Sequence, residues 1–338
     1  PMDIPPSLPP PLAAPPAAPF RDRHTGLIVF GGLLIAIGAF FGLTIPMMLL
    51  GQMQGRVAGN VVSVEHVPHD FKFILPGLVM MTAGATACIW LGIGSIKARR
   101  WARALILCGS WFALCTGILS LFQLPGMLAA IDHAVAQQVG AGQPPGVMLV
   151  FKVMMVVMML AYIAVPGAFV LFYRSPHVRH TCEVRDPVER WTDRCPLPVL
   201  PVCLLQSVGA LSLLFTPAFG GAFPIGSFVL AGWPARLVWL AFGAFSFYAA
   251  RGFYRCDLRV WRVYLIVVAV FGANGAVSLH LLGMEGYYRA SGFSEEQLAV
   301  VLQSPMVRSN SMLWVGLLSG GCFLGYLIYI RRYFRKVN

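Results

Sequence analysis

Long apolar stretches alternate with short polar connections along most of this chain. Each stretch holds roughly 20 residues or more, the length at which an α-helix crosses the ~30 Å hydrocarbon layer of a bilayer. Because lipid offers no partner for an open backbone hydrogen bond, such stretches favour membrane-spanning helices. We expect eight of them, over residues 26–50, 74–96, 102–123, 147–173, 198–217, 234–253, 261–283 and 311–330.

The fifth stretch carries the weakest signal. Pro196, Pro198 and Pro201 crowd its start, and proline lacks the backbone donor that a helix interior uses. The apolar segment that follows, residues 218–232, could be interfacial or re-entrant.

Positive charges gather on one side of the expected bundle. The N-terminal tail, the connections around 97–103, 174–194 and 251–262, and the C-terminal end hold 19 of the 25 lysines and arginines. Cytoplasmic connections of membrane proteins carry this excess, so we predict that both termini are cytoplasmic. The formal net charge of +12 is then a topology signal and an attraction to anionic lipid headgroups, and we expect no nucleic acid as a partner.

Composition agrees with this interpretation. Hydrophobic residues make up 58% of the chain and charged residues 11%, against about 25% charged in a soluble domain. A water-soluble globular domain and a disordered chain are therefore excluded. Residues 1–21 are proline-rich and resemble no cleavable signal peptide, so they are predicted as an extended cytoplasmic tail.

The second half of the chain echoes the first. Asp22-Arg23, Leu33-Leu34, Gly38-Ala39 and Pro46 recur 171 residues later, and Arg99 and Trp101 recur 160 residues later as Arg259 and Trp261. We predict one four-helix repeat over residues 22–175, a cytoplasmic linker over 176–192 and a second repeat over 193–338. Because four is even, both repeats enter the membrane in the same direction. The predicted fold is an all-α integral membrane protein with eight transmembrane helices in two tandem parallel repeats.

The face between two parallel repeats is a natural position for a transport pathway. Pro46 and Pro217 are paired helix breaks near the outer surface, and Gln206 and Asn274 are polar side chains at depth. These four residues form the candidate pathway for a neutral or apolar solute. No carboxylate lies in the middle of an expected span, which argues against coupling to protons or sodium ions.

Two sets of residues could bind a metal ion. On the outer side, His66, His69 and Asp70 offer the imidazole and carboxylate groups that suit zinc or copper. On the cytoplasmic side, two nitrogen and two sulfur ligands could form a closed structural zinc site, from His177, His180, Cys182 and Cys195. A solvated linker is the alternative for this second set. We predict no cofactor beyond structural zinc or bound lipid, and no catalytic residue.

Small residues favour close helix packing. Gly38 and Gly42, and the pairs Gly316/Gly320 and Gly321/Gly325, have the spacing that lets two helix backbones approach. This packing could be internal, or it could form the face of a homodimer or of another membrane-protein partner.

The junction between the repeats runs Arg185-Asp186-Pro187, then Arg190-Trp191-Thr192-Asp193-Arg194-Cys195-Pro196-Leu197-Pro198. Over about residues 173–205, including Cys182, it resembles runs in uncharacterised multi-pass bacterial membrane proteins. The resemblance implies a bacterial inner-membrane location and carries no activity or functional residue.

Three functions remain open on these grounds. The first is a non-enzymatic binding or accessory subunit in the bilayer, because neither buried charges nor a catalytic constellation is evident. The second is a carrier or channel for a neutral or apolar solute, with its pathway between the repeats. The third is an enzyme or metal site at the outer face, which would use His66, His69, Asp70 or His133.

Overall fold

The computed structural model of the chain describes residues 21–57, 71–129, 145–215, 222–290, 293, 295, 298–299, 302 and 311–334. Helices dominate this part of the chain, as the apolar pattern predicts. A long helix overlaps each expected stretch, namely α1 (His24–Val57), α2 (Phe71–Ile96), α3 (Arg100–Leu121), α5 (Pro145–Arg174), α7 (Leu200–Phe215), α8 (Trp233–Tyr254), α9 (Leu258–Ala290) and α12 (Ser311–Phe334). Two short elements, α6 (Pro176–Arg185) and the 3₁₀ turn η2 (Trp191–Asp193), lie in the predicted linker region.

Within the described residues, six helices are long and apolar enough to cross a membrane, namely α1, α2, α3, α5, α9 and α12. The other two long helices differ from an ordinary span. α7 has 16 described residues, which measure about 24 Å. α8 has 22 residues but contains Arg236 and Arg251, and it is less apolar than the six.

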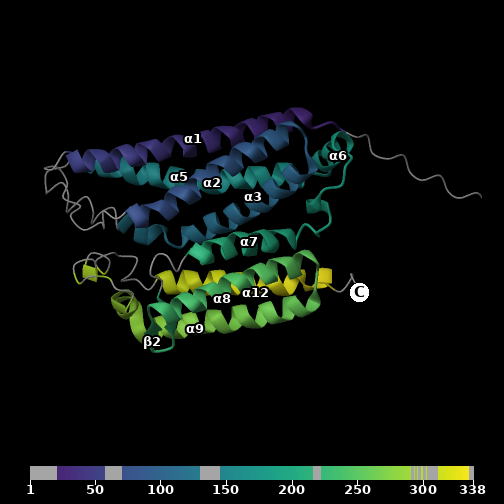
Figure 1. The fold of residues 1–338 in the computed structure, drawn as a ribbon. Helices are drawn as coiled ribbons and strands as arrows, with labels where there is room; N and C mark the ends of the chain where they lie inside the picture. The colour runs from purple at the N-terminus through teal and green to yellow at the C-terminus, as the bar shows by residue number, and fades with distance from the viewer. Residues whose placement is uncertain are drawn as a thin grey trace, which may run out of the picture.

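The long helices form two groups (Figure 1). α1, α2, α3 and α5 make the first group, and α7, α8, α9 and α12 make the second, with α3 and α7 along the boundary. In both groups the first helix packs closely on the second and the third packs on the fourth. The start of α1, α6 and the end of α12 lie at one end of the molecule, which we call the terminal end.

Glycines let α1 and α2 approach closely. A Cβ atom on Gly31 would lie 2.8 Å from the carbonyl oxygen of Gly92, and a Cβ atom on Gly92 would lie 2.6 Å from that of Gly31. A Cβ atom on Gly38 would lie 2.8 Å from the carbonyl oxygen of Ala85. Gly38 therefore packs within the chain, which is one of the two roles that its spacing predicts.

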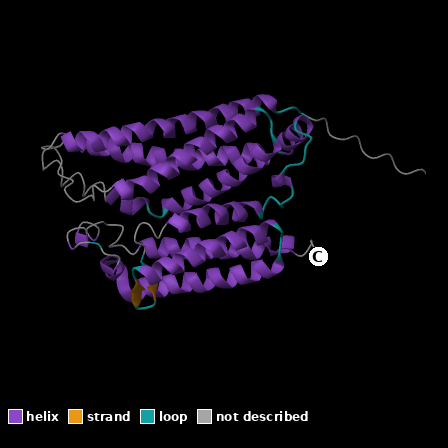
Figure 2. Ribbon diagram, in the orientation of Figure 1, coloured by secondary structure: helices purple, strands orange, loops and turns teal. Residues whose placement is uncertain are grey.

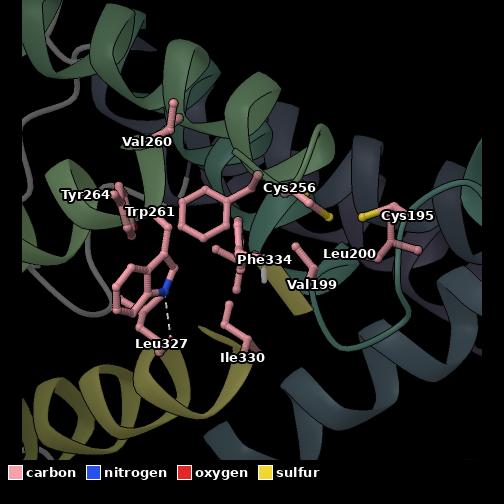
Figure 3. Close-up of a cluster of buried hydrophobic side chains, with 14 of the residues drawn as sticks. Cys195, Val199, Leu200, Cys256, Val260, Trp261, Tyr264, Leu327, Ile330 and Phe334 are labelled. Carbon is pink, nitrogen blue, oxygen red and sulfur yellow. Dashed lines mark hydrogen bonds between the residues drawn. The ribbon is translucent and has the colours of Figure 1, made fainter. Parts of the chain in front are cut away.

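Each group has a buried core near the terminal end. In the first core, Ser95 donates its hydroxyl to the Leu27 carbonyl oxygen at 3.0 Å, and its oxygen lies 2.5 Å from the hydroxyl of Tyr173. In the second core, the rings of Phe253 and Phe334 meet edge to face with centroids 5.5 Å apart. Figure 3 shows the second core, where the Trp261 indole N–H donates to the Leu327 carbonyl oxygen at 2.9 Å.

Similar turns end α2 and α8. Within the described chain, Ala98 and Cys256 are the non-glycine residues with positive φ, at 50° and 53°. The Arg99 N–H donates to the Gly94 carbonyl oxygen at 2.9 Å, and the Asp257 N–H donates to that of Gly252 at 2.9 Å. This hydrogen bond, together with the left-handed residue before it, is the Schellman ending of a helix.

A two-stranded hairpin departs from the all-α expectation (Figure 2). β1 (Phe223–Ile225) and β2 (Phe228–Leu230) pair antiparallel, and Phe223 lies opposite Leu230. Gly226 occupies the left-handed region, with φ of +56°, as two-residue hairpin turns require. Segment 218–232, left open between interfacial and re-entrant, therefore contains a hairpin over its described residues.

Helices α1 and α9 are much longer than the spans predicted for them, because the chain stays helical past the length that crosses a bilayer. α1 continues to Val57 rather than ending near residue 50. α9 continues to Ala290, but Gly283 breaks its helical geometry with φ of 65° and ψ of 173°. Position 283 is where the sequence predicts the end of this span, and a short helical segment follows it.

Candidate functional site

A polar pocket of about 330 Å³ lies at the terminal end, between the two helix groups. Its walls come from the start of α3, from α6, and from the segment that leads through η2 into α7. We call it the junction pocket. Its polar lining consists of three arginines, three acids, a threonine and two cysteines, namely Arg100, Arg103, Arg179, Glu183, Glu189, Asp193, Thr192, Cys182 and Cys195.

A buried carboxylate beside the pocket fixes the linker to α3. The side chain of Asp186 accepts hydrogen bonds from Arg190 at 3.2 Å and from Arg99 at 3.3 Å, and it caps α3 by accepting from the Arg100 backbone N–H at 3.3 Å. Burial by itself raises the pKa of Asp186, but the bonds from Arg190 and Arg100 and the charges of Arg190 and Arg99 outweigh it and hold the pKa below its usual value. The carboxylate is therefore ionised and structural.

Two ion pairs occupy part of the pocket wall. Arg179 donates to Glu183 at 2.7 Å, one helical turn apart on α6, and Arg100 lies 3.5 Å from the Asp193 carboxylate. The hydrogen bond from Arg179 lowers the pKa of Glu183. The second pair joins η2 to the start of α3, and the first lies within α6, so charge as well as packing holds the pocket wall.

Three polar lining groups have spare bonding capacity in the described part of the chain. Arg103 donates its Nε to the Tyr173 carbonyl oxygen at 3.2 Å and forms no ion pair there. Glu189 lines the pocket and is exposed, and no described residue pairs with it. Thr192 is 2% exposed, and its hydroxyl finds no hydrogen-bond partner among the described residues.

The cytoplasmic metal-ligand set is only partly gathered. Cys182 and Cys195 both line the junction pocket and are both buried. Across the described residues, however, no three histidine, cysteine or acidic side chains lie close enough to hold a metal ion. The structure does not bring His177 and His180 to the two thiols as a ligand set. Burial raises the pKa of Cys182 to about 11, so this thiol is protonated and unreactive near neutral pH.

The outer set of ligands, His66, His69 and Asp70, lies outside the described residues, as does His133. These residues therefore stay predictions from the sequence.

The three described residues of the predicted pathway, Pro46, Gln206 and Asn274, do not meet. Pro46 is exposed on α1 in the first group, and Pro217 lies outside the described residues. Gln206 is buried and donates its amide to the Tyr264 hydroxyl inside the second core. Asn274 donates to the Pro224 carbonyl oxygen at 2.9 Å and accepts from the Gly226 N–H at 3.2 Å. Both amides therefore hold the second group together.

The boundary between the groups is closed near the pocket and opens farther along α3. Ala104 and Cys108 of α3 are buried in the second core, among residues of α7, α8, α9 and α12. Farther from the terminal end, Cys115 of α3 and Cys322 of α12 are both exposed. We call this boundary, from Ala104 to Cys115 and Cys322, the seam.

Sequence reasoning missed the junction pocket. Its arginines were counted as orientation signals, and its acids were given no role. The sequence does contain a usable signal. Four of the 13 acids of the chain lie within 11 consecutive residues of this basic connection, namely Glu183, Asp186, Glu189 and Asp193. Acids and arginines in one connection can form charge-assisted hydrogen bonds, which are stronger than neutral ones.

Comparisons with known proteins add no relative. No protein-family model, no curated protein and no solved structure matches the chain.

Proposed function

We propose that this chain is a non-enzymatic binding or accessory subunit of a bacterial inner membrane, with eight spans in two tandem parallel four-helix repeats and both termini in the cytoplasm. Six long apolar helices and their exposed hydrophobic surfaces support membrane insertion. The common position of the start of α1 and the end of α12 (Figure 1) supports an even number of crossings. The basic connections at the terminal end support its cytoplasmic orientation.

Equivalent turns support the duplication. The turn around Ala98 and the turn around Cys256 share one geometry at an offset of 158 residues, as does the pair Gly94 and Gly252. A Cβ atom on Gly94 would clash with Ala102 at 2.7 Å, and a Cβ atom on Gly252 would clash with Val260 at 2.5 Å. The Arg99 and Trp101 match has an offset of 160 residues, two more than this one. Aligning the two turns by structure therefore pairs different residues than aligning them by sequence.

Equivalent core positions support it as well. Ser95 and Phe253 lie 158 residues apart and one residue after those glycines. Ser95 meets Tyr173 of the fourth helix in the first group, and Phe253 meets Phe334 of the fourth helix in the second. Phe334 follows Tyr173 by 161 residues rather than 158, so the fourth helices match about one helical turn out of this register. A Cβ atom on Gly243 would lie 3.5 Å from the Ala210 carbonyl oxygen, which parallels the crossing of Gly38 and Ala85.

The open glycine face of α12 is the observation that carries the binding role. No heavy atom of another described segment lies within 4 Å of a Cβ atom built on Gly316, Gly320, Gly321 or Gly325. The first group uses comparable glycines to pack α1 on α2, whereas these four have no such contact with another described segment. Small residues at this spacing let a second helix backbone approach in lipid. The proposed occupant is a transmembrane helix of a partner subunit or of a second copy.

Purification of the full chain in mild detergent, after cross-linking in the membrane, tests this role. We expect a stoichiometric partner protein or a self-associated species by native mass spectrometry. Gly320→Leu should weaken the association about tenfold, because overpacking costs about 1–3 kcal/mol. Gly272→Leu, at an equally open position on α9, should leave it unchanged. A lone monomer in every preparation would contradict the proposal.

The seam favours the carrier as a second candidate. Cys115 and Cys322 are exposed on helices of different repeats, as the wall of a path between the repeats would be. In membranes, a hydrophilic maleimide should label both thiols if water enters the seam. Labelling only by an apolar, membrane-dissolved reagent would count against a water-filled pathway.

A further inference from the structure

The junction pocket is lined by three arginines and three acids. Two of these six side chains have no ion-pair partner among the described residues. Arg179 and Glu183 form one pair and Arg100 and Asp193 form another. Arg103 and Glu189 remain, one of each sign, without an ion pair in the described part of the chain. A ligand that satisfies both needs a negative and a positive group on one small molecule.

The hydrogen-bonding groups of the pocket suit a phosphate beside an ammonium. The Nη groups of Arg103 and the buried hydroxyl of Thr192 can donate to phosphate oxygens. Glu189 can accept from an ammonium. A purely anionic headgroup would leave Glu189 unpaired close to a second negative charge. A quaternary ammonium has no N–H to donate to that carboxylate.

The pocket also lies where a lipid headgroup would be. Arg100 begins α3, and α3 is one of the helices apolar enough to span the bilayer, so the pocket is level with one end of a span. Ala104 lines the pocket and is also part of the seam. Ala104 and Cys108 are buried, but farther along α3 the side chains of Trp111, Phe112 and Cys115 are exposed. A molecule with its headgroup in the pocket could lay its apolar part against that farther stretch of α3.

We propose that the junction pocket binds the headgroup of phosphatidylethanolamine, with the phosphate at Arg103 and Thr192, the ammonium at Glu189 and the acyl chains along the seam. This binding rests on the membrane-subunit function proposed above. The lipid would join α3 to the segment that leads into α7, and so would link the first helix group to the second at the terminal end.

Native mass spectrometry of the full chain in mild detergent, with equal amounts of phosphatidylethanolamine, phosphatidylglycerol and phosphatidylcholine, tests the site. We expect phosphatidylethanolamine to be retained about fivefold over the other two, the ratio that an exposed ion pair of about 1 kcal/mol supplies. Arg103→Gln should reduce retention of all three lipids. Arg262→Gln, an exposed arginine of α9 outside the pocket, should change none of them.

Glu189→Gln keeps the test decisive if Arg103→Gln does not fold, because Glu189 is exposed. This variant should lose the preference for phosphatidylethanolamine and retain phosphatidylglycerol better than the native chain. An unchanged preference in Glu189→Gln, or equal retention of the three lipids by the native chain, would overturn the site. Full displacement by water-soluble glycerophosphoethanolamine would overturn the role of the seam. A partner protein that still co-purifies in those cases would leave the subunit function standing.

Discussion

The hydroxyl oxygens of Ser95 and Tyr173 lie 2.5 Å apart where α2 meets α5, and the Ser95 hydroxyl is donated onward to the Leu27 carbonyl oxygen at 3.0 Å. Ser95 therefore accepts from Tyr173 and joins three helices of the first group through one buried oxygen. Under the proposed duplication, Ser95 corresponds to Phe253, and Tyr173 lies in the fourth helix of its group as Phe334 does. Two predictions follow from this arrangement.

Ser95→Ala should destabilise the chain more than Tyr173→Phe. The first change leaves the buried Tyr173 hydroxyl and the Leu27 carbonyl oxygen without partners, at about 1–3 kcal/mol for each unsatisfied group. The second change removes only the donor to Ser95, at about 1 kcal/mol. Thermal unfolding in detergent, followed by tryptophan fluorescence, measures the order. The double variant should cost less than the sum of the two single variants, and additive costs would show that the hydroxyls do not interact.

Phe253 and Phe334 of the second group offer a test of the proposed duplication. Phe253→Ser should cost about 3–5 kcal/mol, because it empties a large volume in the second core. Adding Phe334→Tyr should recover about 1 kcal/mol, since the new hydroxyls can then form the bond that Ser95 and Tyr173 form. Phe334→Tyr alone should destabilise, because it buries a hydroxyl without a partner. If the double variant is no more stable than Phe253→Ser, the two positions are not equivalent.

The apolar pattern predicted where helices form but not how charged connections meet. Each expected stretch contains a helix, because burial of an unpaired backbone in lipid leaves few alternatives. The proline-rich start of the fifth stretch is tolerated because Pro201 lies in the first turn of α7, where the missing N–H has no partner to lose. The hairpin was missed because Phe223–Ile225 and Phe228–Leu230 are as apolar as a span, and the Gly226-Ser227 turn between them was not weighed.

The junction pocket could not be predicted from local sequence. Arg100 and Asp193 are 93 positions apart in the chain, and their contact depends on how the linker returns over the start of α3. Periodicity reports which face of one element is apolar and carries no information on which charged connection lies beside another. For the same reason, Gln206 was assigned to a pathway, although its partner Tyr264 lies in the same helix group.

Asp186→Asn should destabilise the chain in a pH-dependent way. The folded pKa of Asp186 is lowered, so its carboxylate adds stability that is complete above the unfolded pKa of about 3.9 and is lost as the pH falls through the folded pKa. Near about pH 6 the native chain should exceed Asp186→Asn by about 2 kcal/mol, the value of hydrogen bonds to a charged group. Unfolding at a series of pH values should show this difference shrinking below about pH 4.

Asp257→Asn is the matched control for this series. Asp257 is exposed and accepts from the Arg259 backbone N–H at the start of α9, and asparagine caps a helix about as well as aspartate does. Its stability should stay within about 0.5 kcal/mol of the native chain over the whole range. A difference between the native chain and Asp186→Asn that does not change with pH would show that the carboxylate acts through its shape and not through its charge.

Neighbouring glycines of α1 should respond to the same substitution with opposite signs. In Gly31→Ala the new methyl group would lie 2.8 Å from the Gly92 carbonyl oxygen, a backbone atom that cannot move without separating α1 from α2. We expect a loss of about 1–3 kcal/mol from this overpacking. In Gly32→Ala the methyl group meets no heavy atom within 4 Å, so the higher helix propensity of alanine should raise stability by up to about 1 kcal/mol. Thermal unfolding of the two variants in one detergent measures both signs. Equal effects would show that α1 and α2 do not cross at Gly31.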